Sequence, residues 1–358
     1  MVRLTLKPLG FSCEYLERRT IMLIKVLGID LGKTSFHLIG HDYAGREVYR
    51  KKCNRAQLLK ILLQLDKTTV AMESCAGSHW LARKCQQFGH NTKLIPPQYV
   101  KPYVKTNKND YIDADAIAEA STRPSMRFVS VKTEESQILS AVQRIRSGFI
   151  KEQTATMCRI GALLLEFGIN FPRGHAAMGK LFQWLADKNH TLPPLLLQEL
   201  AVLYEHYQYL HQKIAEQDKK IKAVLKESEM GELLQTIPGI GPMIASACLS
   251  EVPSPKDFKN GRHLAAWVGL VPRQYSTGGK STLLGISKRG NKSLRTLFIH
   301  GARALISRPK IAEAIFGDWI TELLKRKPFN VVVVALANKL ARIAWSVMVT
   351  GLPFRKLN

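Results

Sequence analysis

Hydrophobic residues in the first third of the chain occur in short β-type runs, which later alternate with helical segments. Three short strands are predicted between Lys25 and about Arg50, with a turn at 41–45. Apolar residues at helical spacing predict helices at 57–65, 80–88 and about 110–121, and strands are predicted at 68–73 and 91–95. Three strands followed by alternating helix and strand predict an α/β domain with a mixed sheet.

The pattern changes between Thr133 and about Glu229. Long stretches there lack Gly and Pro, apolar residues recur at helical spacing, and Lys, Glu and Gln occupy the other faces. Interruptions are expected near 171–174 and at Pro193–Pro194. We predict an extended helical hairpin or coiled-coil arm, and we assign no chemistry to it.

The last region opens with a helix, an Ile-Pro-Gly-Ile-Gly-Pro turn and a second helix, over 233–247. This order is typical of a helix-hairpin-helix element. Gly239 and Gly241 allow a tight turn, and backbone N–H groups at the start of the second helix are suited to bind a phosphate. A plain helix-turn-helix packing element remains the alternative.

These changes of pattern predict a chain of several parts. Residues 1–21 are poorly patterned and Met22 directly precedes the first strand, so we expect a poorly ordered extension or an assigned start upstream of the real one. An α/β domain is expected over 22–130, the helical arm over 131–230, and a mainly α-helical C-terminal domain over 231–350.

Charge narrows the class of partner. The chain has 53 Lys and Arg against 28 Asp and Glu, a formal net charge of +25, which indicates a polyanionic partner and most simply nucleic acid. A membrane is a weaker alternative, because the best apolar stretch, 331–350, contains Asn338, Lys339 and Arg342 and suits a packed amphipathic helix. Six scattered cysteines without a C-x-x-C motif fit a reducing cytosol.

The positive charge is concentrated between Lys256 and Arg303, where ten Lys and Arg accompany one acid, Asp257. Within this window, 269–291 is rich in glycine, hydroxyl groups and cations, and we predict a loop that lies along a phosphate backbone. A solvated surface loop is the alternative, but the interleaved Trp267 and Tyr275 favour binding. The expected nucleic-acid contacts are Arg273, Lys280, Lys288, Arg289, Lys292 and Arg295, together with Gly239 and Gly241.

A set of carboxylates carries the candidate chemistry. Asp30 lies in an apolar strand and Glu73 ends another, so neighbouring strands could present both acids at one rim. Asp110 and Asp113 are three apart and share one face of a helix. Asp115 is expected to turn away as a solvated or helix-capping acid. Hard oxygen ligands without Cys or His indicate Mg²⁺ or Mn²⁺, and two such ions can flank a phosphodiester.

At this point the chain resembles the DEDD-type insertion-sequence transposases, whose relatives include pilin-gene inversion recombinases and RNA-bridged recombinases. The matching motifs are Gly28-Ile-Asp-Leu-Gly, Ala71-Met-Glu-Ser, Asn109-Asp-Tyr-Ile-Asp-Ala, Ile237-Pro-Gly-Ile-Gly, Trp267-Val-Gly-Leu-Val-Pro, Ser276-Thr-Gly-Gly-Lys and Ile286-Ser-Lys-Arg-Gly-Asn-Lys-Ser-Leu-Arg. The resemblance covers roughly residues 22 to 345 and implies an RNase H/RuvC-like fold for the N-terminal domain.

The resemblance also implies a mechanism. The N-terminal carboxylates would hold Mg²⁺, and a serine of the C-terminal domain would attack a DNA phosphodiester and form a phosphoserine–DNA linkage before strand exchange. Motif position assigns that serine to Ser276; an ungapped match would assign it to Thr277, and Ser281 and Ser287 are less favoured. The implied partners are element-end and target DNA and a bridge RNA, in a dimer or tetramer associated with the nucleoid in a bacterial cytoplasm.

Three functions compete at this stage. The first is a Mg²⁺-dependent DNA transposase or site-specific recombinase. The second is a RuvC-like structure-specific endonuclease that hydrolyses DNA with metal-activated water. The third is a nucleic-acid-binding protein that has lost catalysis. The long arm and the Ser-Thr-Gly-Gly segment favour the first over the second, and the four acids favour either enzyme over the third.

Overall fold

The computed structural model describes residues 24–105, 109–172, 174–187 and 192–355. The extension predicted for 1–21 lies outside these residues. The chain divides into two compact units, Met1–Thr133 and Glu134–Asn358. The helical arm and the C-terminal helices therefore share one unit, where the sequence pattern predicted a domain boundary near residue 230.

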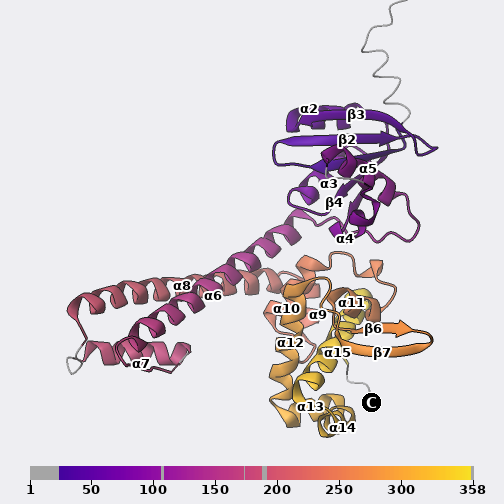
Figure 1. The fold of residues 1–358 in the computed structure, drawn as a ribbon. Helices are drawn as coiled ribbons and strands as arrows, with labels where there is room; N and C mark the ends of the chain where they lie inside the picture. The colour runs from indigo at the N-terminus through magenta and orange to yellow at the C-terminus, as the bar shows by residue number, and fades with distance from the viewer. Residues whose placement is uncertain (1–23, 106–108, 173, 188–191, 356–358) are drawn as a thin grey trace, which may run out of the picture. The chain divides into compact units, whose positions relative to one another are not determined.

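The first unit is built on a five-stranded mixed sheet with the strand order β3-β2-β1-β4-β5 (Figure 1). Strands β1 to β3 are antiparallel neighbours, and β4 and β5 run parallel to β1. The mixed α/β sheet predicted from the sequence is confirmed. The elements of the first unit are β1 (Val26–Leu31), β2 (Ser35–His41), β3 (Glu47–Asn54), α2 (Arg55–Gln64), β4 (Thr69–Glu73), α3 (Ser78–Gln87), β5 (Asn91–Ile95), α4 (Pro97–Val100), η1 (Lys101–Tyr103) and α5 (Asp110–Ser121).

Helix α5 packs directly on the central strand β1. Leu27 and Ile29 of β1 are fully buried. A Cβ atom added to Gly28 would lie 2.2 Å from the backbone oxygen of Ala114 and 2.8 Å from the Cβ of Ala118, so only glycine allows this close approach. The small side chains of α5 thus fix the distance between this helix and β1.

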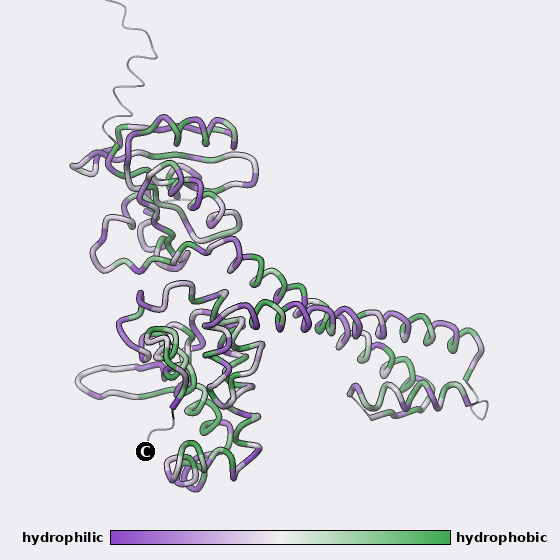
Figure 2. The backbone as a smooth tube through the Cα atoms, turned by 180° about the vertical axis from the view of Figure 1, so that it is seen from behind, coloured by the Kyte–Doolittle hydropathy of each residue, from purple (hydrophilic) through white to green (hydrophobic). Residues whose placement is uncertain are grey.

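The second unit begins with two long helices that pack against each other (Figure 1). These are α6 (Glu134–Leu165) and α8 (Pro194–Lys226), with α7 (His175–Ala186) between them in sequence. Hydrophobic and hydrophilic residues alternate along both (Figure 2). The helix ends fall near the predicted interruptions, and Pro193 is the N-cap of α8.

The remaining α-helices share one hydrophobic core with the start of α6 and the end of α8. Ile221 and Leu225 of α8 belong to the same buried cluster as Phe298, Leu336 and Leu340. The elements are α9 (Glu229–Gln235), α10 (Pro242–Glu251), η2 (Pro255–Asp257), α11 (Gly261–Val268), β6 (Pro272–Thr277), β7 (Lys280–Ile286), α12 (Lys292–Ile306), α13 (Pro309–Phe316), α14 (Asp318–Arg326) and α15 (Phe329–Thr350).

Helix α15 contains the apolar stretch 331–350, for which a membrane segment was the alternative. By length and composition alone it could cross a membrane, and it is the one such helix among the described residues. Half of its most apolar window is buried inside the unit, and Val332, Leu336 and Leu340 are fully buried. It is therefore a core helix, as its internal polar residues predicted.

Candidate active site

Asp30 and Glu73 lie at the same edge of the sheet. Strands β1 and β4 are parallel, and Ile29 is paired with Met72, so the next residues in each strand are the two acids. Both side chains are partly buried. The parallel pairing brings together two carboxylates that are 43 positions apart in the sequence, at the rim where the sequence pattern suggested that they could meet.

Asp110 and Asp113 arrive from the first turn of α5. The Asn109 side chain caps this helix by accepting a hydrogen bond of 2.9 Å from the Tyr111 backbone N–H. Two acids in the first turn are stabilised by the positive end of the helix dipole. Because α5 packs on Gly28, its first turn lies beside the end of β1, close to Asp30.

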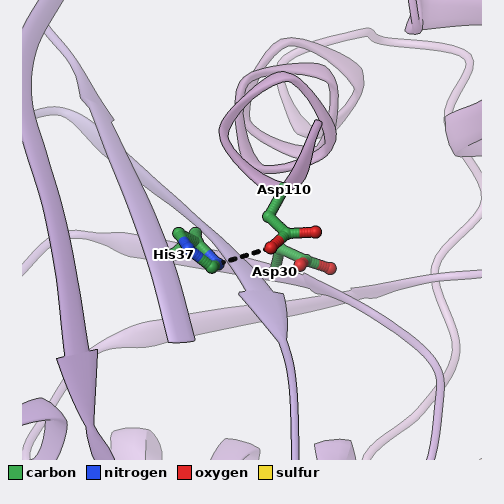
Figure 3. Close-up of side chains that lie close together, drawn as sticks. All are labelled: Asp30, His37 and Asp110. Atoms are coloured by element: carbon green, nitrogen blue, oxygen red, sulfur yellow. Dashed lines mark ion pairs between the residues drawn. The ribbon is translucent and has the colours of Figure 1, made fainter. Parts of the chain in front are cut away.

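His37 completes the cluster and was not predicted from the sequence. It is paired with Asp30 across β1 and β2, and it is buried. Its Nδ1 lies 3.4 Å from Oδ2 of Asp110, and one ligand atom from each of Asp30, His37 and Asp110 lies within 4.8 Å of the others. Figure 3 shows Asp110 pointing from α5 toward the other two side chains. The Tyr111 ring packs edge-on against the imidazole at 4.8 Å.

The acids also influence one another electrostatically. Burial raises the pKa of Glu73, and the charges of Asp30 and Asp113 raise it further. Burial, Glu73 and Asp30 together raise the pKa of the neighbouring Cys75 thiol. Excess negative charge in a partly buried site is relieved by a bound cation. Carboxylate oxygens with one imidazole nitrogen therefore fit a divalent metal ion, with Asp30, His37 and Asp110 as the nearest set of ligands.

Asp115 corrects one expectation. It turns away from the cluster as predicted, but it is neither simply solvated nor a cap. Its Oδ1 is hydrogen-bonded at 2.7 Å to Nε2 of His41, which is a buried residue of β2. Asp115 thus ties α5 to the sheet on the side away from Asp30.

The predicted basic loop is a β-hairpin. Strands β6 and β7 pair around Gly278 and Gly279, both with positive φ, and every residue of the two strands except Ile286 is exposed. Figure 1 shows the hairpin as a free pair of arrows. Two glycines between residues of high β propensity form a two-residue turn that matches the strand twist, so the sequence did contain a hairpin signal.

Ser276 lies exposed in β6, opposite Ser281. The Gln274 amide donates hydrogen bonds to both hydroxyls, at 2.8 Å to Ser276 and 3.1 Å to Ser281. Thr277 is the next residue of the strand, so its side chain projects from the opposite face. The Oγ of Ser287 is buried, with no hydrogen-bond partner among the described residues. Ser276 and Ser281 therefore share one donor and one exposed face of the hairpin, whereas Thr277 faces the other way and Ser287 is buried.

The predicted phosphate-contacting residues are of two kinds. Arg273, Lys280, Lys288, Arg289 and Lys292 are exposed. Arg295 is buried, and its Nη1 donates to the backbone oxygens of Val268 at 2.9 Å and Arg289 at 3.2 Å. The prediction of a phosphate contact does not fit Arg295, because its guanidinium holds the segment before α12 against the end of α11.

The Pro-Gly-Ile-Gly turn joins α9 to α10 as expected, but it is packed inward. Gly239 has a φ of +86°, and a Cβ on Gly301 of α12 would lie 2.2 Å from its backbone oxygen. Gly241 is exposed, but the first residue of α10 is Pro242, which has no N–H to donate. The packing accounts for Gly239 without a phosphate, and a helix-hairpin-helix function is not established by it.

Both units of the chain are similar to known transposases. The transposase profile of the DEDD IS110 type matches residues 27–169, and that of the transposase IS116/IS110/IS902 family matches 231–316. The transposase for insertion sequence element IS1328 of Yersinia enterocolitica is 46% identical over 93% of this chain and 99% of its own length. A probable family 20 transposase of Pseudomonas aeruginosa is 42% identical over 91% and 97%. The pilin gene-inverting protein of Moraxella bovis is 21% identical over 92% and 97%.

Proposed function

Because the chain belongs to the IS116/IS110/IS902 family of DNA transposases and recombinases, we propose that it cuts and rejoins DNA with a divided active site. The carboxylates of the first unit form one part, and Ser276 of the β6–β7 hairpin forms the other. The observation that supports this most strongly is the convergence of Asp30, Glu73, Asp110 and Asp113 from two strands and a helix.

Mg²⁺ is the proposed metal, with Mn²⁺ as the alternative that the imidazole of His37 favours. When bound, the ion supplies positive charge that stabilises the phosphorane-like transition state and the leaving oxygen. The protein's contribution is to fix the ligands: β1 and β4 set the spacing of Asp30 and Glu73, and the capped first turn of α5 presents Asp110.

Ser276 is the proposed nucleophile. Its Oγ would form a bond to phosphorus while one of the two DNA ester oxygens leaves, which conserves a phosphodiester for later strand exchange. Gln274 donates to this Oγ, so it orients the hydroxyl and favours its anion, but it cannot take the proton. A different group must therefore take the proton.

Three finer assignments complete the proposal. We propose that element-end and target DNA are held by a dimer or tetramer, because exchange between two DNAs needs several active sites. A bridge RNA from the element is the proposed guide, and the net charge of +25 suits RNA as well as DNA. The name of the Moraxella relative, a pilin gene-inverting protein, supports recombination as the reaction type. The proposed location is the bacterial cytoplasm, at the nucleoid.

The experiment is a search for a covalent intermediate. Purified protein is incubated with element-end DNA, flanking RNA and Mg²⁺, and the products are separated under denaturing conditions. A protein–DNA adduct is expected. Cleavage without an adduct would instead establish the alternative, a RuvC-like structure-specific endonuclease that uses metal-activated water. Absence of both cleavage and adduct would favour a binding protein.

A further inference from the structure

The second unit contains a large pocket that no residue of the β6–β7 hairpin lines. It has a volume of about 1020 Å³ and lies among the start of α11, the end of α13, the C-terminal half of α15 and the segment that follows α15. Its volume is at the upper end of the range for small-molecule sites, about 300–1000 Å³, so there is room for more than one nucleotide.

Positive charge surrounds this pocket without compensation. Arg262, Lys339, Arg342 and Arg355 line it, and no Asp or Glu does. None of these four cations forms an ion pair with another of the described residues. Burial lowers the pKa of Lys339, and the charge of Arg342 lowers it further. Cations held together in this way attract an anionic ligand.

The walls of the pocket are apolar and aromatic. Phe316, Phe354 and Ile343 line it. Nζ of Lys339 lies 5.1 Å from the centroid of the Phe316 ring and 4.2 Å from that of Trp319, so its position is fixed by cation–π contacts. Arg342 is also placed by close packing, because a Cβ on Gly261 would lie 2.9 Å from its backbone oxygen. Cations beside flat apolar rings are the combination that binds single-stranded nucleic acids.

We propose that this pocket binds unpaired nucleotides, with bases stacked on Phe316 and Phe354 and phosphates bound by Arg262, Lys339, Arg342 and Arg355. The proposal relies on the nucleic-acid substrate of the proposed function, but on neither the carboxylates nor Ser276. The unpaired strand is DNA opened during exchange or RNA. An acidic protein segment would satisfy the charges equally, but a chain of this family and net charge has nucleic acid as its abundant polyanion.

The test measures binding in EDTA, so that catalysis plays no part. Full-length protein is titrated into four fluorescent oligonucleotides: single-stranded DNA, single-stranded RNA, a duplex with unpaired 2-aminopurines, and the fully paired duplex. We expect quenching of the unpaired 2-aminopurine. Phe354→Leu keeps an apolar side chain but removes the ring, and should weaken binding of the unpaired oligonucleotides about tenfold with little change for the paired duplex.

A charge variant gives an independent readout. Arg342→Ala should reduce the slope of log affinity against log salt by about 0.7 for single strands. The matched control is Lys325→Ala, which removes a cation of α14 that is exposed and already paired with Glu322 at 2.8 Å. Whichever single strand binds more tightly identifies the source. Unchanged binding in Phe354→Leu and Arg342→Ala would overturn the proposal, as would binding of a polyglutamate peptide in place of the oligonucleotides. A missing covalent adduct would leave these measurements unaffected.

Discussion

Two regions carry the proposed chemistry, and they are built in opposite ways. Strand β1 is the centre of a five-stranded sheet, with Leu27 and Ile29 fully buried and α5 in close contact. The β6–β7 hairpin is a two-stranded sheet whose residues are exposed along almost its whole length. Packing holds the carboxylates in place before any partner binds, whereas Ser276 is held by its strand pairing and by Gln274 alone.

The buried frame of β1 and the exposed hairpin suit two different tasks, which are to hold the carboxylates and to present the nucleophile. Carboxylates that repel one another need a rigid frame, because the frame must oppose the repulsion until a cation arrives. A nucleophile that attacks and then carries a DNA strand needs an open position, because a bulky phosphodiester must reach it. We therefore expect substitutions in the first region to change folding and metal binding, and those in the hairpin to change chemistry or DNA binding with little effect on stability.

The largest expected effect is on the reaction. Asp30→Asn and Ser276→Ala should each lower DNA strand transfer by at least about a thousandfold, since one removes a metal ligand and the other the nucleophile. In a binding assay Asp30→Asn should bind DNA as tightly as wild type or more tightly, because it removes a negative charge. Thr277→Ala is the matched control and should stay active. Weaker DNA binding by Asp30→Asn would indicate a structural role instead.

A pair of glycine substitutions tests the contrast in packing. Gly28→Ala would place its Cβ 2.2 Å from the Ala114 backbone oxygen, and we expect a loss of about 3 kcal/mol in the free energy of unfolding. Gly285→Ala in β7 meets no atom within 4 Å and should change stability by less than about 0.5 kcal/mol. Urea denaturation measures both. Equal losses would show that the hairpin is as tightly packed as β1.

Substitutions of two basic residues of α12 compare a buried cation with an exposed one within the second unit. Arg295→Ala should lose about 2 kcal/mol of stability, because a buried guanidinium no longer holds two backbone oxygens. Lys292→Ala should leave stability unchanged or slightly raised, since a cation at a helix N-terminus is unfavourable. It should reduce the salt slope of duplex binding by about 0.9. The reverse pattern would contradict the division into structural and phosphate-binding cations.

The smallest effect concerns pH and the metal-free carboxylates. The pKa of Glu73 is raised in the folded chain, so the folded state binds its proton more tightly than the unfolded state. Stability is therefore lost as pH rises from the ordinary glutamate pKa through the raised one. In EDTA, Glu73→Gln should melt about 3 °C above wild type at neutral pH and show no gain at acidic pH. Added Mg²⁺ should raise the melting temperature of wild type more than that of the variant. A gain independent of pH would rule out this electrostatic cause.

The α/β layout could be predicted because each strand and helix of the first unit has a clear local pattern. His37 could not, because its role depends on the register of β2 against β1, and a shift of one residue would turn it to the other face. Pairing Leu31 with Phe36 across the four-residue connection 32–35 fixes that register and places His37 opposite Asp30.

In the second unit, the burial of a charged side chain could not be predicted from the sequence. Arg295 lies among exposed cations in the sequence, and only the packing of α12 on α11 reveals that it is buried. The hairpin could have been predicted from the sequence, because Gly278–Gly279 between residues of high β propensity is a hairpin signal. Charge and glycine content alone favoured a loop there, whereas the structure has a hairpin; the phosphate contact of this segment stays a prediction.

The most direct test of the divided active site is to map the covalent adduct. Protein trapped on element-end DNA is digested with protease and nuclease, and the nucleotide-bearing peptide is sequenced by mass spectrometry. The account predicts a nucleotide on Ser276, formed with Mg²⁺ and absent from Asp30→Asn. A nucleotide on Thr277 or Ser281, or an adduct of undiminished yield in Asp30→Asn, would contradict it.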